Sequence, residues 1–156
     1  MRRSVVVVPV LAAAVLGSPA AHADNKRLND GVIANVYTLQ RQAGCAGDVR
    51  KNPQLQLAAE WHANDVLANR TLGGDLGSDG STPQSRAAAA GYAGSVSQTV
   101  AINPALAISG VELIRQWYYD PVDFAIMTDC ANTQIGVWSV NSLDRTVVVV
   151  VYGNPS

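Results

Sequence analysis

The chain has 156 residues, with 11 basic and 12 acidic side chains and a formal net charge of −1 at pH 7. This length suits one domain with one hydrophobic core. No stretch is rich in Lys and Arg. A nucleic-acid partner would require such a basic patch, so we expect no nucleic-acid binding.

The beginning of the chain is typical of a secretory signal. Arg2 and Arg3 give a positive start, an apolar run follows over residues 5–16, and residues 21–23 form a small-x-small cleavage site. The apolar run is too short to span a bilayer. We therefore predict a secretory signal peptide at residues 1–23, with an uncleaved membrane anchor as the alternative.

The predicted mature domain, residues 24–156, contains both cysteines, Cys45 and Cys130. In an exported chain two cysteines most simply form a disulfide. The alternative is two free thiols with one as a nucleophile, and neither cysteine has a local sequence setting for that chemistry. We expect a monomer without a transmembrane segment, either secreted to the extracellular space or retained in the cell envelope.

Two helices are predicted in the first half of the mature domain. Apolar residues at helical spacing from Leu28 to Leu39 predict a first helix that stops at Gly44. The Asn52-Pro53 pair predicts the start of a second helix, with Asn as cap and Pro in the first turn. The predicted inner face of this second helix consists of Leu55, Ala58, Ala59, His62 and Val66.

A loop over residues 69–80 precedes a predicted short third helix. Ser81 and Gln84 have capping-box spacing, which predicts a helix start at Ser81 and an end at Gly91. Alternating apolar and polar residues over 96–101 predict a short strand.

A fourth helix is predicted to begin at Asn103-Pro104 and to end at Asp120-Pro121. Its predicted inner face consists of Val111, Ile114 and Tyr118, with Leu113 and Trp117 close to it.

Two strands are predicted at the end of the chain, over residues 135–140 and 146–152, with a turn at 141–144. The second strand contains five consecutive valines. A strand that is apolar at every position is covered on both faces. We therefore predict an α+β fold, a three-layer α-β-α sandwich with a small mixed or antiparallel sheet.

Five motifs along the chain resemble those of a known extracellular family. The motifs are Asn29 to Leu39; Leu55, Ala58 and His62-Ala63-x-Asp65; Gly77, Asp79, Gly80, Pro83, Arg86 and Gly91-Tyr92; Trp117-Tyr118-Tyr119-Asp120-Pro121; and Ile135-Gly136-Val137 with Thr146 to Gly153. In this order they resemble bacterial members of the superfamily of cysteine-rich secretory proteins, antigen 5 and plant pathogenesis-related 1 proteins, known as the CAP or SCP-like domain. The resemblance implies the same sandwich fold and covers about residues 28–153.

The resemblance also implies a degenerate cleft. Family members often hold two His and two acids there, able to bind a divalent metal. At the matching positions this sequence has Leu76 and Asp123 in place of the His, and Gln98 and Gln134 in place of the acids. Leu cannot bind a metal, and an amide is neither charged nor a general base. We therefore expect no metal, no cofactor and no catalytic residue.

Acidic residues remain near the cleft positions. Asp75, Asp79, Asp120 and Asp123 supply the oxygen ligands that a hard cation such as calcium prefers. The alternative interpretation, which we favour, is a loop cap, a helix end and solvated charge. We interpret His62 as a packed helix histidine.

Three functions remain open from the sequence. The first is a secreted, non-enzymatic CAP-like domain that binds a lipid- or sterol-type apolar ligand, or an envelope protein. Its cleft candidates are Leu76, Gln98, Asp120, Asp123 and Gln134. The second is a weak hydrolase or cation-dependent enzyme in which Asp120 and Asp123 divide the acid and base roles. The third is a purely structural envelope or host-interaction protein.

Overall fold

The computed structural model describes the backbone of residues 19–156 and the side chains of residues 25–156. Most of the predicted signal peptide, residues 1–18, lies outside the described residues, and that prediction remains open. In the described residues the elements are α1 (Pro19–Gln42), β1 (Arg50–Lys51), α2 (Pro53–Ala68), α3 (Pro83–Ala89), β2 (Ser95–Asn103), α4 (Gly110–Tyr118), α5 (Pro121–Thr128), β3 (Gln134–Ser142) and β4 (Arg145–Asn154).

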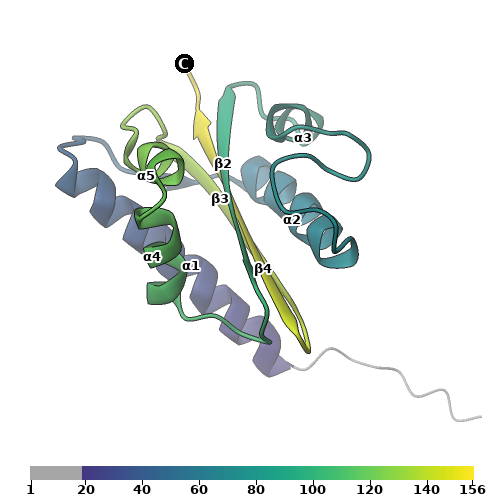
Figure 1. The fold of residues 1–156 in the computed structure, drawn as a ribbon. Helices are drawn as coiled ribbons and strands as arrows, with labels where there is room; N and C mark the ends of the chain where they lie inside the picture. Colours follow the sequence, from purple (N-terminus) through teal and green to yellow (C-terminus); the bar gives the residue numbers. More distant parts are fainter. Residues whose placement is uncertain (1–18) are drawn as a thin grey trace, which may run out of the picture.

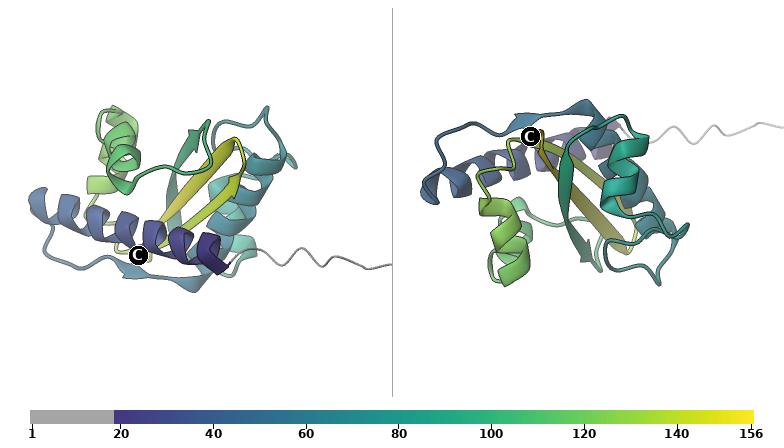
Figure 2. Two further views of the ribbon diagram at one scale, coloured as in Figure 1. Left: turned by 90° about the horizontal axis from the view of Figure 1, so that it is seen from below. Right: turned by 90° about the horizontal axis from the view of Figure 1, so that it is seen from above.

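The described chain forms three layers, with the sheet between two groups of helices (Figure 1). Helices α1, α4 and α5 cover one face, and α2 and α3 cover the other. Figure 2 shows from two further sides that α4 and α5 lie across the sheet from α2 and α3. The predicted α+β sandwich is confirmed.

The four strands form one mixed sheet in the order β1-β3-β4-β2. Strand β4 pairs antiparallel with β2 and with β3, whereas β1 pairs parallel with β3 over only two residues. The sequence analysis did not predict β1. A two-residue strand is too short to leave a periodic signal in the sequence.

The valine run of β4 is buried on both faces, as predicted. Val148 and Val150 belong to the core under α1, α4 and α5, and Val147, Val149 and Val151 belong to the core under α2 and α3. Successive side chains of a strand point to opposite faces, so one continuous apolar run can serve two cores.

The disulfide between Cys45 and Cys130 is present, as predicted, and joins residues 85 positions apart. Cys45 follows the end of α1, where Gly44 has a φ of 90°. Cys130 lies between α5 and β3. In the chain-entropy view, a loop of this length is worth about 4 kcal/mol of stability. The disulfide therefore fixes the end of α1 to the segment that enters β3.

Helices α2 and α3 start much as predicted. The Asn52 side chain accepts hydrogen bonds from the backbone N–H groups of Gln54 and Leu55. The capping box of α3 lies one residue further along than predicted, with Thr82 as cap and Ser85 as its reciprocal partner. The shift follows from Pro83, which takes the first helical position and leaves the cap to the residue before it.

The start of the predicted fourth helix is wrong, and so are two residues of its inner face, whereas its end before Asp120-Pro121 agrees with the structure. Helix α4 begins at Gly110 after the Ser109 cap, and a further helix, α5, follows at Pro121 behind the Asp120 cap. The buried side chains of α4 are Leu113 and Trp117. The predicted inner residues Val111 and Tyr118 are 80% and 46% exposed. Apolar residues lie on both sides of this helix, so their spacing alone did not identify the buried face.

None of the helices in residues 19–156 is both long enough and apolar enough to cross a membrane.

Gly136 lets α2 approach β3 closely, and we expect Gly136→Ala to destabilise the fold by about 3 kcal/mol because it overpacks the interface. A Cβ at this position would lie 2.1 Å from the backbone nitrogen of Gln56 and 2.2 Å from the carbonyl carbon of Leu55. Urea unfolding of the mature protein measures the effect. Gly73→Ala is the matched control, because nothing lies within 4 Å of its added Cβ, and it should change stability by less than about 0.5 kcal/mol. Equal stability of both variants would contradict the close approach.

Candidate functional site

A hydrogen-bonded group at the β2 edge of the sheet contains one of the predicted cleft residues. We call Asp75, Arg86 and Gln98 the polar cluster. The Gln98 amide donates to the Asp75 carboxylate at 3.0 Å, and the Arg86 guanidinium donates to the Gln98 carbonyl oxygen at 3.2 Å. Arg86 also donates to the backbone carbonyl of Asp75 at 2.7 Å. The three residues come from a loop, from α3 and from β2.

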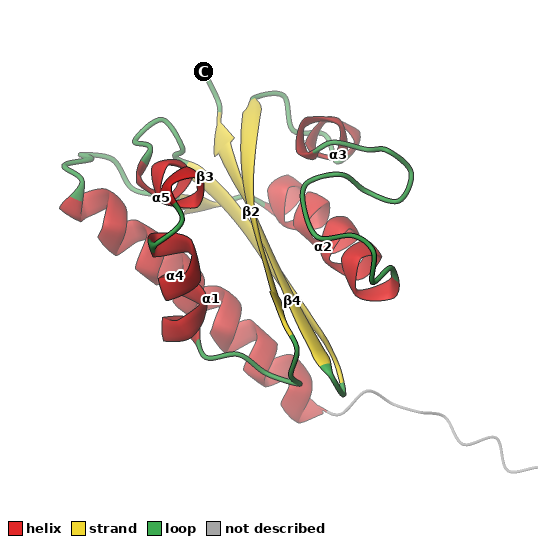
Figure 3. Cartoon of the chain, in the orientation of Figure 1, coloured by secondary structure: helices red, strands yellow, loops and turns green. Residues whose placement is uncertain are grey.

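Arg86 is the centre of this cluster, and its side chain is only 6% exposed. Its second terminal nitrogen donates to the backbone carbonyl and the hydroxyl of Ser81, at 2.9 and 3.0 Å. A buried charge is tolerated only when it is paired and hydrogen-bonded. The loop between α2 and α3, drawn in green in Figure 3, supplies most of the acceptors of this guanidinium through Asp75 and Ser81.

Asp65 on α2 holds the same loop from the other side. Its carboxylate accepts hydrogen bonds from the backbone N–H and the hydroxyl of Ser78, both at 2.7 Å. Gly77 leaves room for these side chains, because a Cβ there would lie 2.5 Å from the Ser81 hydroxyl oxygen. These hydrogen bonds lower the pKa of Asp65 although partial burial opposes them.

A second polar group lies on the α5 side of the sheet. The fully buried Tyr152 hydroxyl is 3.1 Å from the Thr99 hydroxyl, and burial raises the pKa of Tyr152. Asp123 on α5 is part of this environment. Burial, together with the negative charges of Asp120 and Asp75, raises the pKa of Asp123 to about 6. Because the charge of Asp75 affects the pKa of Asp123, Asp123 interacts electrostatically with the polar cluster.

His62 is completely buried on α2, in agreement with its interpretation as a packed histidine. Its Nε2 is 2.8 Å from the backbone carbonyl of Gly74, which makes Nε2 the protonated nitrogen. Burial lowers the pKa of His62. A neutral histidine that donates to a loop carbonyl has a structural role in holding that loop.

The other predicted cleft residues lie apart from the polar cluster. Leu76 is 60% exposed, and the residue before it, Asp75, makes the contact with Gln98. Asp120 caps α5 by accepting from the backbone N–H groups of Val122 and Asp123. Gln134 begins β3, next to Asn52, and β4 lies between it and the strand that carries Gln98.

The polar cluster does not fit the divalent metal that the family resemblance implies. Among the described residues no group of three or more His, Cys, Asp or Glu side chains could hold a metal ion. The Arg86 guanidinium lies 3.2 Å from the oxygen of Gln98 that would have to be a ligand. A fixed positive charge at that distance opposes a cation, and Arg does not lose its proton in proteins.

An exposed apolar region lies on the outer side of α4 and α5. We call Val111, Tyr118, Tyr119, Val122 and Phe124 the aromatic surface. The ring of Tyr118 packs edge-on against the rings of Tyr119 and Phe124, with centroids 5.4 and 5.0 Å apart. Tyr119 and Val122 are 73% and 69% exposed. Aromatic side chains exposed together in this way are typical of binding surfaces.

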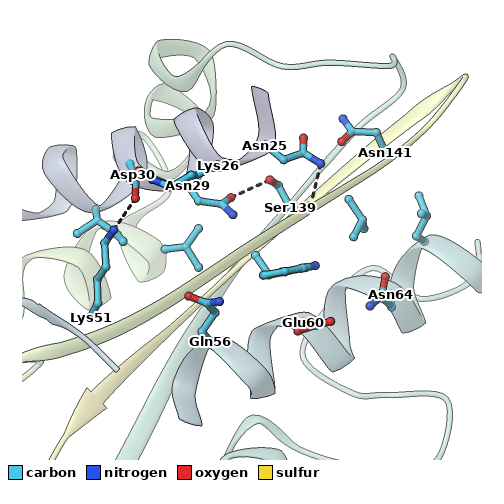
Figure 4. A pocket seen from close by; sticks show the side chains of 15 residues that line it. Asn25, Lys26, Asn29, Asp30, Lys51, Gln56, Glu60, Asn64, Ser139 and Asn141 are labelled. Atoms are coloured by element: carbon cyan, nitrogen blue, oxygen red, sulfur yellow. Dashed lines mark hydrogen bonds and ion pairs between the residues drawn. The ribbon is translucent and has the colours of Figure 1, made fainter. Parts of the chain in front are cut away.

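A groove of about 690 Å³ lies at the opposite edge of the sheet, between α1 and α2 (Figure 4). It contains none of the polar cluster and none of the aromatic surface.

The cysteine-rich secretory protein family matches residues 35–152 by its sequence profile. The chain belongs to this family, known as CAP. No curated protein matches it in sequence.

Solved structures support the CAP fold. An outer surface protein from Borrelia burgdorferi is 17% identical, with a TM-score of 0.73, over 85% of this chain and 96% of that protein. A cysteine-rich secretory protein from Staphylococcus aureus is 10% identical, with a TM-score of 0.64, over 83% of this chain and 39% of that chain. An extracellular protein containing a SCP domain from Bacillus anthracis is 13% identical, with a TM-score of 0.64, over 90% of this chain and 45% of that chain.

Sequence reasoning missed three residues of this region. It did not give Asp65 the role of loop anchor, Arg86 that of a buried charge, or Thr99 that of the partner of Tyr152. Asp65 has a weak sequence signal, since it lies one helical turn after His62 on α2. Hydrogen bonds that join separate elements leave no spacing pattern in the sequence.

The raised pKa of Asp123 predicts a pH-dependent stability. The folded state holds this proton more tightly than the unfolded chain, so the contribution of Asp123 to stability is complete below about pH 4 and is lost as the pH rises through about 6. Asp123→Asn should therefore stabilise the protein by about 1 kcal/mol at neutral pH, after allowance for solvent screening, and by almost nothing near pH 4. Urea unfolding at both pH values measures this. An equal effect at both would contradict the assignment.

Proposed function

We propose that this CAP domain is an extracellular, non-enzymatic binding domain that recognises an envelope protein through the aromatic surface. The observation that carries the proposal is the exposure of Tyr118, Tyr119 and Val122 on adjoining helices whose other faces form the core. Tyr is enriched at protein interfaces because its ring is apolar and its hydroxyl remains satisfied by water or a partner. The descriptions of two similar structures as an outer surface protein and an extracellular protein support the location.

The non-enzymatic part of the proposal is supported by the polar cluster. The buried Gln98 side chain makes its hydrogen bonds within the protein, to Arg86 and Asp75. A catalytic group must instead keep a donor or acceptor available for a substrate. His62 is buried and bonded to a loop carbonyl, so it does not supply a base.

Two features favour a protein over a lipid as the partner. A lipid- or sterol-type ligand requires a pocket that buries most of its surface, whereas the hollow beside Val111 and Tyr119 is lined by the polar Glu112, Arg115 and Gln116. Attraction to anionic lipid headgroups requires a cluster of basic side chains. On α4 and α5, Arg115 is accompanied by acidic residues.

Photo-crosslinking in the envelope of the producing cell tests this proposal. A photoreactive phenylalanine replaces Tyr119 in the full chain, and we expect a single protein-sized adduct by gel electrophoresis and mass spectrometry. Leu143 is the matched control, since it is apolar and 91% exposed but lies in the β3–β4 turn. The same probe at Leu143 should give no such adduct.

Other results of the same experiment contradict the proposal. A lipid-sized adduct at position 119 would replace the protein partner by an apolar small ligand. The absence of any adduct, or the same adducts from both positions, would remove the aromatic surface as a specific binding site.

The environment of Asp123 favours a second candidate, a weak hydrolase. A carboxyl group with a pKa raised to about 6 beside two further carboxylates is suited to hold a proton for transfer near neutral pH. Asp120 is occupied by the helix cap, so Asp123 would act as the acid.

Activity of the mature protein on a panel of peptides and glycans tests this second candidate. This second candidate predicts an activity that falls as the pH rises through about 6, as Asp123 loses its proton, and that disappears in Asp123→Asn. An activity that Asp123→Asn leaves unchanged would contradict the role of this residue, and a panel without any activity would contradict the hydrolase.

A further inference from the structure

Most of strand β3 has no strand on its outer side. Its pairing with β1 ends at Ile135, where the backbone N–H of Asn52 donates to the Ile135 carbonyl. The N–H and C=O groups of one strand residue point to the same side, and this side alternates along the strand. The backbone groups of Val137, Ser139 and Asn141 therefore point outward, away from β4. Such a row of outward backbone groups is a template for another strand.

The groove of about 690 Å³ lies along this outer side of β3 (Figure 4). Residues of α1 form one wall, residues of α2 form the other, and β3 forms the floor. The groove side chains that carry an amide are Asn25, Asn29, Gln56, Asn64 and Asn141. Amide side chains both donate and accept, as peptide backbone groups do.

The other edge of the sheet, at β2, is partly covered by side chains. At β2 the backbone N–H of Val96 donates to the Gln84 side chain at 3.0 Å. The indole of the buried Trp117 donates to the Val100 carbonyl at 3.2 Å. One exposed side chain of α3 and one buried side chain of α4 thus each satisfy an outward group of β2.

In the groove, the outward backbone groups of β3 receive one long hydrogen bond, from Asn25. The Asn25 amide donates to the Ser139 carbonyl at 3.3 Å, and the Ser139 hydroxyl donates to Asn29 at 2.7 Å. The outward groups of Val137 accept no hydrogen bond from, and donate none to, a described side chain. The backbone N–H of an added strand could bind the Ser139 carbonyl in place of the Asn25 amide. Only one long hydrogen bond would be lost.

We propose that this groove binds an extended peptide segment of a partner protein, which adds to the sheet as a strand beside Val137–Asn141. The peptide would continue the line of β1, which already pairs with β3 at the mouth of the groove. Five residues of β3 offer about 17 Å of edge. Main-chain hydrogen bonds to Val137, Ser139 and Asn141 hold the segment, and its alternate side chains contact the α1 and α2 walls.

The charged side chains at the mouth of the groove favour a peptide with an acidic end. Lys26 and Lys51 both pair with the single carboxylate of Asp30. One positive charge remains in this group of three. An acidic residue at the end of the peptide next to β1 would neutralise it, so the groove favours segments with Asp or Glu at that end. This site does not depend on the aromatic surface, which lies on α4 and α5.

Selection from a displayed library of random linear peptides tests the proposal on the mature protein. Peptides of about 12 residues are long enough to span the open edge. We expect the enriched peptides, made synthetically, to slow hydrogen exchange of the Val137, Ser139 and Asn141 amides. We also expect alternating sequences with an acidic end. Failure to enrich any peptide, or protection confined to another surface such as α4 and α5, would overturn the proposal.

Two tryptophan variants of α2, one inside the groove and one outside it, test where the peptide binds. Gln56→Trp places a large side chain in the groove from an exposed position of α2, and we expect peptide affinity to fall by about tenfold or more. Gln54→Trp on the same helix lies outside the groove and should leave affinity unchanged. Equal affinity of both variants would place the peptide elsewhere.

A second pair tests the backbone pairing itself. Proline lacks the N–H group, and edge strands tolerate it where that N–H faces outward. Ser139→Pro should therefore lose peptide binding, whereas Ser139→Ala, which also lacks the hydroxyl bond to Asn29, should retain it. Retained binding in a folded Ser139→Pro would contradict strand addition. Crosslinking through position 119 should be unaffected by these variants, so this proposal and the proposed function can fail independently.

Discussion

Strand β4 lies between β2 and β3 and is buried on both faces, so both groups of helices depend on its packing. Its valines alternate between the two cores. Tyr152 of the same strand belongs to the core next to the candidate site. The Tyr152 hydroxyl has one described partner, Thr99 on β2. Because every residue of β4 except the last is buried, the strand cannot shift its register without exposing one core.

The second constraint is the burial of one guanidinium. Arg86 needs several acceptors because it is charged and almost inaccessible to water, and the α2–α3 loop supplies them through Asp75 and Ser81. Asp65 then holds the loop in the shape that this requires. Gln98 consequently forms part of a hydrogen-bonded network with Arg86 and Asp75. The Asp123 carboxyl group does not belong to this network.

The surfaces left available differ in kind. The aromatic surface offers exposed rings and aliphatic side chains, whereas the β3 groove offers backbone groups and amides. The difference follows from topology. Helix α4 needs only Leu113 and Trp117 for the core, which leaves its outer side free, and β1 ends after two residues, which leaves β3 unpaired. A single small domain can thus present an apolar surface and a strand edge on separate sides.

The sequence by itself determined the layers, because the valine run of β4 requires cover on both faces, and it determined the disulfide and the α2 cap at Asn52. The family resemblance also named Gln98 and Asp123 as cleft candidates, and this remains a prediction. Only the tertiary structure decided that Asp75, and not Leu76, contacts Gln98, and that Gln134 lies two strands away. The reason is physical. Periodicity and caps are local, whereas the partners of a buried charge and the pairing of an edge strand depend on which distant segments meet when the chain folds.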